Sequence, residues 1–187
     1  MTSDLTFITN EEHQTLLERF RTLIKDSRFF DVLVGYFYTS GFYGLYKSLE
    51  KTEKIRILIG IGTNPDTIHL IQEAKRATQP MLPPSHAEVK QQLEEDVARE
   101  MEQSEDNSNV EEGVQKFIEL LQSGKLEIRA YPTPNIHAKL YIMTFKQGDR
   151  DVGRIITGSS NFTGAGLRDN LEFNVELKNR PDYEFAK

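Results

Sequence analysis

Three short segments in the last third of the chain carry residue types that could act together on a phosphodiester. In chain order, these residues are His137, Lys139, Gly158, Ser159, Asn161, Asn170 and Glu172. They supply an imidazole, an ammonium, small hydrogen-bonding groups and a carboxylate. A neutral imidazole can attack phosphorus and form a phosphohistidine, which divides one difficult displacement into two easier ones. The set therefore predicts phosphodiester cleavage that needs no metal ion and no other cofactor.

Each of the main side chains has an expected role in this chemistry. His137 is the expected nucleophile, and Glu172 is the carboxylate expected to hold its ring in the reactive tautomer. Lys139 would neutralise a nonbridging oxygen of the phosphate, while Ser159 and Asn161 donate hydrogen bonds to it. Preorganised donors of this kind contribute about 3–4 kcal/mol each to lowering a barrier.

The spacing of the residues suggests how they could meet. Successive side chains of a strand point to opposite faces, so His137 and Lys139 share one face, and the two later pairs do the same. Three neighbouring strand ends that carry such pairs can converge on one phosphate. Asn170 and Gly158 are expected to support the site.

A second histidine is needed, because the leaving alkoxide must receive a proton from a general acid. The other histidines, at positions 13, 69 and 86, are not followed by a lysine two places on and do not precede a Gly-Ser-x-Asn segment. The simplest solution is that two identical chains each contribute His137 across a two-fold axis. We therefore expect a homodimer.

Length and composition limit the classes of protein to consider. The 187 residues are enough for one domain that folds without disulfides, and the chain has no cysteine. A thiol nucleophile, a CxxC redox pair and a thiolate zinc site are thereby excluded. We see no signal peptide and no stretch long enough to span a membrane, and we expect a soluble cytoplasmic protein.

The charge of the chain is unevenly distributed. The formal net charge is −6, which by itself argues against nucleic acid as a partner. Between Glu88 and Glu112, however, ten acidic residues face only two basic ones, so this segment carries −8 and the rest of the chain about +2. The net charge therefore does not decide the partner. We expect an acidic, exposed helical and linker insert at about residues 80–112.

The hydrophobic pattern predicts a single α/β domain whose mixed, largely parallel central sheet is flanked by helices. Helices are expected at about 11–25, 42–49, 64–75 and 110–122, and strands at 29–38, 54–60, 126–131, 139–145, 153–158 and 171–177. The first two strands and the helix between them should form a parallel β-α-β unit. Residues 181–187 look like the start of a helix, from which we expect a fragment of a longer polypeptide.

These motifs resemble those of the phospholipase D superfamily, which has His-x-Lys, four residues, Asp, and then Gly-Ser-x-Asn. Residues 158–163, followed by 170–172, are especially similar to its small bacterial nuclease branch. Members of that branch carry one motif per chain and dimerise to complete the site. Residues 34–41 and 54–60 look like the first strands of the family. The resemblance implies a phospholipase D-like fold and a DNA endonuclease module.

A finer resemblance concerns the segment around residues 36–42. It is similar to the amino-terminal domains of bacterial helicase-like and restriction-associated proteins. This implies DNA as a partner and a fused helicase domain beyond Lys187. The aromatic residues at 36–38 could stack on bases, although aromatic residues of a buried strand usually belong to the core.

One departure from the family pattern leaves alternatives open. Thr144 stands where the family has Asp. On a regular strand this position faces away from His137, so we expect it to be structural. Its loss still leaves a catalytically silent module for DNA binding and dimerisation as a rival reading, beside a lipid or nucleotide phosphodiesterase. Glu176 is the alternative to Glu172 as the catalytic carboxylate.

Overall fold

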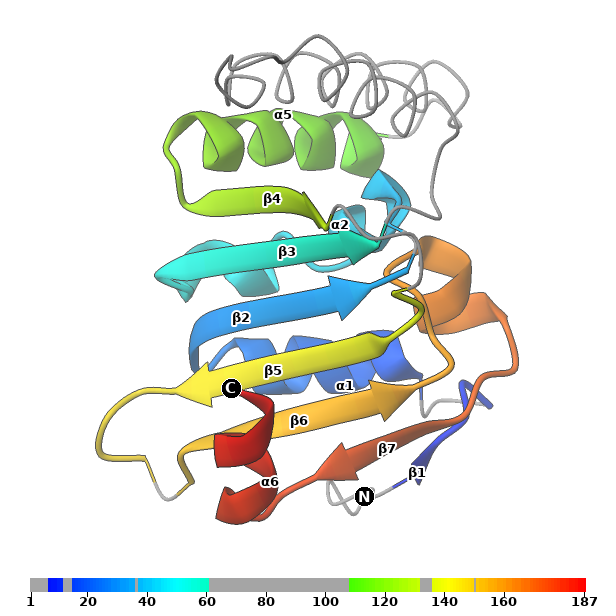
Figure 1. The fold of residues 1–187 in the computed structure, drawn as a ribbon. Coiled ribbons are helices and arrows are strands. Elements are labelled where there is room, and N and C mark those ends of the chain that lie inside the picture. Colours follow the sequence, from blue (N-terminus) through cyan, green and yellow to red (C-terminus); the bar gives the residue numbers. More distant parts are fainter. Residues whose placement is uncertain (1–6, 12–14, 36, 61–107, 132–135, 150) are drawn as a thin grey trace, which may run out of the picture.

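A seven-stranded sheet forms the centre of the part of the chain that the structure describes (Figure 1). The structure is a computed structural model, and it describes residues 7–11, 15–35, 37–60, 108–131, 136–149 and 151–187. The strand order is β1-β7-β6-β5-β2-β3-β4. The strands are β1 (Phe7–Ile8), β2 (Ser27–Val34), β3 (Lys54–Gly60), β4 (Leu126–Tyr131), β5 (Lys139–Phe145), β6 (Gly153–Gly158) and β7 (Asn174–Leu177).

The sheet is mixed, as predicted, but parallel pairing is confined to one half of it. β2, β3 and β4 run parallel to one another, whereas the other four pairings of described strands are antiparallel. The expectation of a largely parallel sheet is therefore wrong in its proportions. The physical reason is the connections: a short hairpin such as the one between β5 and β6 can only join antiparallel strands.

Helices cover both faces of the sheet, which confirms the predicted α/β class. They are α1 (Leu16–Ile24), α2 (Thr39–Tyr43), a 3-10 turn η1 (Ser48–Lys51), α5 (Ser108–Gln122), a π-helical turn η2 (Ala165–Asp169) and α6 (Arg180–Ala186). In Figure 1, α1 and α2 lie behind the sheet, α6 lies in front of it, and α5 runs along the β4 edge. None of the helices in the described ranges is long and apolar enough to cross a membrane.

Two hydrophobic clusters match these two layers. The larger cluster lies between the sheet and α1, α2 and α5, and Phe20, Phe30 and Tyr141 are among its fully buried side chains. The smaller cluster packs Tyr183 of α6 on Ile142 and Ile155 of the opposite face. Because β5 alternates, Tyr141 faces the larger cluster and Ile142 the smaller one.

The strands predicted at 54–60, 126–131, 139–145 and 153–158 have the bounds expected for them. The first predicted strand ends earlier, at Val34, because the chain leaves β2 and Phe37 forms a bridge to Phe162 instead. The last begins later, at Asn174. The amide of Phe173 donates to the hydroxyl of Ser159 (2.9 Å) rather than to a strand carbonyl. The helix expected at 64–75 and most of the acidic insert lie outside the described residues.

Candidate active site

The strand pairing brings the three predicted segments to the same end of the sheet. Val34, the last residue of β2, pairs with Lys139, the first residue of β5. Leu140 pairs with Thr157 near the end of β6, and Gly158 pairs with Asn174 at the start of β7. The segments that precede β5, follow β6 and precede β7 therefore meet beside the end of β2.

His137 and Lys139 are in direct contact. The Lys139 Nζ atom lies 3.0 Å from each ring nitrogen of His137 and 3.3 Å from its carbonyl oxygen. His137 is exposed, whereas only 7% of Lys139 is exposed. This burial lowers the pKa of the Lys139 ammonium, and the negative charge of Glu172 acts in the opposite direction. Glu172 is thus close enough to Lys139 to influence it electrostatically.

Two glycines allow the segment before β5 to approach the sheet closely. An ideal Cβ atom at Gly60 would lie 2.4 Å from the carbonyl oxygen of Ile136, so a side chain there would displace the backbone next to His137. A Cβ atom at Gly35 would lie 3.3 Å from His137 Cδ2 and 3.8 Å from Asn161 Oδ1. The imidazole and the Asn161 amide therefore both pack over Gly35, which places two of the predicted side chains side by side.

Ser159 and Glu172 are joined by a hydrogen bond from the serine hydroxyl to the carboxylate. The same hydroxyl oxygen accepts the amide hydrogen of Phe173 at 2.9 Å. Gly158 makes this possible, because a Cβ atom there would lie 2.2 Å from the carbonyl oxygen of Phe173. A hydroxyl has only one hydrogen to donate. In this arrangement the hydrogen of Ser159 is directed to Glu172, so Ser159 positions the carboxylate.

Neither Ser159 nor Glu172 lies on a strand, which corrects the geometry expected from alternation. β6 ends at Gly158, and residues 170–173 precede β7. A turn closes at Asn170, whose amide donates to Ala165 O at 2.8 Å. The segments are held by side chains and by backbone hydrogen bonds outside the strands, from Ser159 N to Phe173 O (3.1 Å) and from Glu172 N to Thr9 O (3.3 Å).

Ser160 is the variable residue of the Gly-Ser-x-Asn segment, and its buried hydrogen bonds attach that segment to the sheet. It is fully buried, and its hydroxyl accepts a hydrogen bond from Asn174 Nδ2 at 2.8 Å. Its carbonyl accepts the hydroxyl hydrogen of Tyr141 at 2.8 Å. Burial raises the pKa of the Tyr141 hydroxyl well above its usual value, with a smaller contribution from the charge of Glu172. Tyr141 is thereby held as a neutral donor.

Glu176 does not lie in the site. It is buried in an ion cluster, where Arg19 of α1 holds it with two hydrogen bonds of 2.6 and 2.8 Å. Arg154 Nε lies 3.3 Å from the other side of the same carboxylate, close enough for an ion pair although its N–H is not aligned for a hydrogen bond. This carboxylate is structural, and Glu172 is the one placed beside Lys139.

Thr144 faces away from the site, as expected from its position. Its hydroxyl lies 2.7 Å from the hydroxyl of Tyr183, on the face of the sheet that α6 covers. Thr144 therefore links β5 to α6, on the face of the sheet opposite to the larger hydrophobic cluster.

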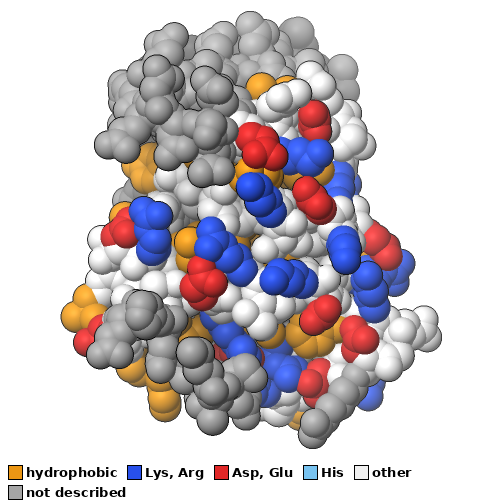
Figure 2. Space-filling model, turned by 180° about the vertical axis from the view of Figure 1, so that it is seen from behind, with side chains coloured by type: hydrophobic (Ala, Val, Ile, Leu, Met, Phe, Trp, Pro, Cys, Tyr) orange, Lys and Arg blue, Asp and Glu red, His pale blue; other side chains and the backbone are white. Residues whose placement is uncertain are grey.

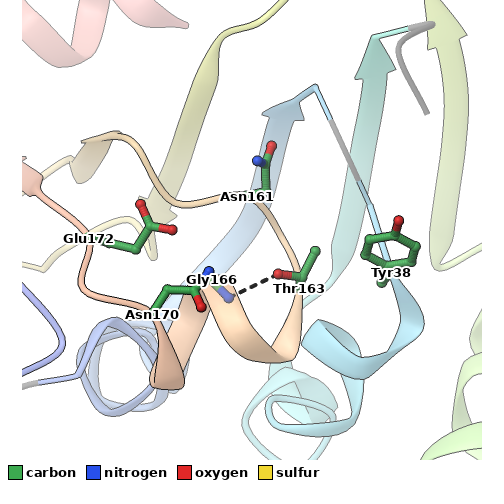
Figure 3. A pocket seen from close by; sticks show the side chains of 6 residues that line it. All are labelled: Tyr38, Asn161, Thr163, Gly166, Asn170 and Glu172. Carbon is green, nitrogen blue, oxygen red and sulfur yellow. Dashed lines mark hydrogen bonds between the residues drawn. The ribbon is translucent and has the colours of Figure 1, made fainter.

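A hollow of about 310 Å³ adjoins these residues. It is lined by Tyr38, Asn161, Thr163, Gly166, Asn170 and Glu172. Figure 3 shows Glu172 and Tyr38 on opposite sides of it, with Asn161 between them. The floor is stiffened by a hydrogen bond of 2.9 Å from the Gly166 amide to the Thr163 hydroxyl, drawn as a dashed line in Figure 3. His137 adjoins the hollow through Asn161, since both pack on Gly35.

Asn10 is a functional contributor that sequence reasoning missed. Its side-chain amide donates to the carbonyls of Gly166 and Asn170, each at 3.0 Å, and its Oδ1 accepts from the Leu16 amide at 2.8 Å. Its φ of +64° places it in the left-handed region. Asparagine tolerates that region better than most residues, and this is the only signal the sequence offered. Asn10 thus ties the start of α1 to the wall of the hollow.

The other residues that reasoning from sequence missed are Gly35, Gly60, Ser160 and Asn174. Their importance depends on contacts with segments far away in the chain, and no local pattern reveals such contacts. The other three histidines, at positions 13, 69 and 86, lie outside the described residues.

Comparisons with known proteins show the family of the chain and support its fold. The sequence profile of a family described as "Cardiolipin synthase, PLD-like domain" matches residues 23–187. The crystal structure of phosphatidylserine synthase from Haemophilus influenzae Rd KW20 is similar, with a TM-score of 0.52 and 16% identity, over 97% of this chain and 35% of that one. That of yeast tyrosyl-DNA phosphodiesterase has a TM-score of 0.45 and 13% identity, over 92% and 32%.

The chain spans about a third of the length of these two structures, and at such identities the likeness concerns the fold. A comparison with curated protein sequences gave no match.

Proposed function

This chain belongs to the PLD-like domain family, and from that premise we propose that it is a metal-independent phosphodiesterase that cleaves DNA through a phosphohistidine at His137. The observation that carries the proposal is the contact of Lys139 Nζ with the His137 ring at 3.0 Å, next to Asn161 and Glu172. It supports a site in which the proposed nucleophile, a cation and an amide donor act on one phosphate.

In the proposed reaction, Lys139 and Asn161 bind the substrate phosphate. The Lys139 ammonium has lost most of its water to burial, and the charge of Glu172 offsets this loss only in part. An incoming phosphate adds countercharge, and the interaction is stronger than it would be in water. Asn161 donates from its amide to the same phosphate. Ser159 can donate as well only by rotating its hydroxyl away from Glu172, because it has one hydrogen to give.

The chemistry then follows in two displacements. A neutral ring nitrogen of His137 attacks phosphorus, the P–N bond forms, and the P–O bond to the leaving alkoxide breaks. The alkoxide takes a proton from a second histidine, which then removes a proton from water as the water attacks the phosphohistidine and restores the free ring. Glu172, held by Ser159, orients the imidazole through its remaining lone pairs.

The second histidine is His137 of another copy of the chain, so the proposed enzyme is a homodimer with one shared site. The support for this is the sequence, in which no other histidine carries the same motif. The association with helicase-like or restriction-associated proteins, and a helicase domain beyond Lys187, remain predictions.

Electrostatics do not oppose DNA as the substrate. Outside the acidic segment, residues 88–112, the chain sums to about +2. Figure 2 shows the face behind the sheet, where Lys and Arg side chains gather across the middle but alternate with Asp and Glu. This face is no continuous basic stripe, so we assign recognition of the phosphate to the site itself.

A nuclease assay in excess chelator tests the proposal. The parent protein should cut DNA under these conditions, and His137→Ala should lose at least about 10²-fold in rate. Acid quenching should trap a phosphorylated protein in the parent alone. Phe185→Ala is the matched control, because Phe185 is 95% exposed on α6. Cutting that requires Mg²⁺ and survives His137→Ala would refute the proposal, and DNA binding without turnover would favour the silent module.

A further inference from the structure

Among the described residues, Tyr38 is the one aromatic side chain that lines the hollow beside the site. It is 47% exposed, whereas its neighbour Phe37 is only 7% exposed. The two adjacent aromatic residues therefore have different functions. Phe37 belongs to the core, and Tyr38 presents a ring to whatever occupies the hollow.

The position of this ring is fixed relative to Asn161. The Tyr38 amide donates to the carbonyl of Phe162 at 3.0 Å, and Phe37 stacks on Phe162 with ring centroids 5.5 Å apart and planes 8° from parallel. Phe117 of α5 extends the stack on the other side of Phe37, at 6.2 Å. Since Phe162 follows Asn161 directly, these contacts hold the backbone of Tyr38 close to that of Asn161.

The other walls of the hollow show which ligand the ring suits. The remaining lining residues are polar or glycine: Asn161, Thr163, Gly166, Asn170 and Glu172. Among the described residues, these five offer no large apolar side chain for an acyl chain. A nucleobase, in contrast, has a flat π-face for the ring and polar edges for the amides. The volume of about 310 Å³ is at the lower end of the range of ligand sites.

We propose that Tyr38 is a stacking platform for the nucleobase adjacent to the scissile phosphate. The inference rests on the proposed function, because it requires nucleic acid as the substrate. Every base has a π-face, so stacking on Tyr38 positions the strand without selecting a sequence. Asn161 and Lys139 hold the phosphate at one end of the nucleotide, and Tyr38 holds its base at the other.

Binding measured without turnover tests this assignment. A single-stranded oligonucleotide containing 2-aminopurine is titrated with His137→Ala protein, which cannot cut it. The fluorescence of the bound base should be quenched. In the His137→Ala protein, the additional substitution Tyr38→Ala should abolish the quenching and weaken binding about 5-fold to 150-fold, the range for the loss of one stacked base. Tyr38→Phe in the same His137→Ala protein keeps the ring, and its affinity for the oligonucleotide should stay within about twofold of that of His137→Ala alone.

Two controls isolate the base. With an oligonucleotide that has abasic sites throughout, Tyr38→Ala should make no difference to binding. Phe185→Ala removes a more exposed aromatic side chain, 95% against 47%, from α6 and should leave binding to both oligonucleotides unchanged. Tyr38 precedes α2 without a side-chain capping bond, so its replacement removes no helix cap.

The outcomes separate this proposal from the proposed reaction. Equal binding of the 2-aminopurine strand by the parent and Tyr38→Ala would overturn the stacking role, even if chelator-resistant cutting is observed. Quenching that depends on Tyr38 would support it even if no cutting is detected. Binding to anionic phospholipid vesicles that depends on Tyr38, without binding to DNA, would also overturn it and would assign the ring to a lipid headgroup.

Discussion

Burial of Lys139 lowers the stability of the folded protein, and we relate this cost to the proposed binding of phosphate. Its ammonium is buried against His137, and this burial lowers its pKa. A charged group that loses its water destabilises the folded state unless a partner compensates. In the free protein the compensation from Glu172 is the smaller effect. We interpret the loss of folding stability as a consequence of holding the ammonium in place for the phosphate before the substrate binds.

We predict that Lys139→Met stabilises the protein near neutral pH while it lowers phosphodiesterase activity about 10²-fold to 10³-fold. The sign follows from proton linkage. Below the lowered folded-state pKa, lysine is charged in both states and the burial cost is fully present. As the pH rises through that pKa toward 10.5, the ordinary pKa of a lysine side chain, the unfolded chain binds more protons than the folded one, and the wild type gains stability.

Urea unfolding of both proteins at about pH 7 and about pH 10 measures this difference, which should shrink at the higher pH. Lys146→Met is the matched control, because Lys146 is exposed in the loop after β5. It should change the free energy of unfolding by less than about 0.5 kcal/mol. A Lys139→Met protein that is less stable than the wild type at neutral pH would contradict the prediction.

At the scale of elements, β7 is fastened to α1 by charge as well as by packing. Glu176 of β7 is fully buried, and its partners Arg19 and Arg154 have side chains that are 11% and 15% exposed. Removing one partner of such a cluster leaves buried charge without compensation. The pairing thus fixes the strand from which Glu172 extends.

We predict that Glu176→Gln destabilises the protein by about 3–5 kcal/mol, because two arginines are left facing an uncharged amide. Activity per folded molecule should be retained, since Glu176 does not contact the site. Urea unfolding and the activity of the native fraction measure the two effects. Glu184→Gln breaks an exposed pair with Arg180 (3.4 Å) and should cost less than about 1 kcal/mol. Loss of activity in fully folded Glu176→Gln would instead assign this carboxylate a direct role.

At the scale of the whole molecule, a shared site makes activity depend on both subunits. Each proposed site needs His137 from two chains, so a dimer with one His137→Ala subunit has a nucleophile or a general acid, but not both. A mixed dimer should therefore be inactive, although one of its subunits is wild type.

We predict that a refolded mixture of wild-type and His137→Ala chains has activity proportional to the square of the wild-type fraction. The protein should also elute with twice the chain mass of 21.5 kDa in light-scattering measurements. Phe185→Ala chains, mixed in the same way, should leave the activity unchanged. A linear dependence on the wild-type fraction would show that each chain works alone.

Much of the fold was accessible from local pattern. The strands at 54–60 and 139–145 were predicted to the residue, because a run of β-branched and apolar residues between turn signals depends on neighbours in the chain. The ends of β2 and β7 were not, because they are set by Phe162 and Ser159, which approach from distant segments. The antiparallel pairing of β2 with β5 escaped prediction for the same reason, because it joins strands far apart in the sequence.

For the site, the sequence by itself determined the chemical inventory: a histidine and a lysine two residues apart, a Gly-Ser-x-Asn segment and a carboxylate downstream. It could not decide between Glu172 and Glu176, since alternation gives both the same face of a continuous strand. The tertiary structure decided where each of the two carboxylates lies. β7 begins only at Asn174, and Arg19, 157 residues away in sequence, neutralises Glu176. A buried carboxylate requires a cationic partner. Only the folded structure determines that Arg19 contacts Glu176 and not Glu172.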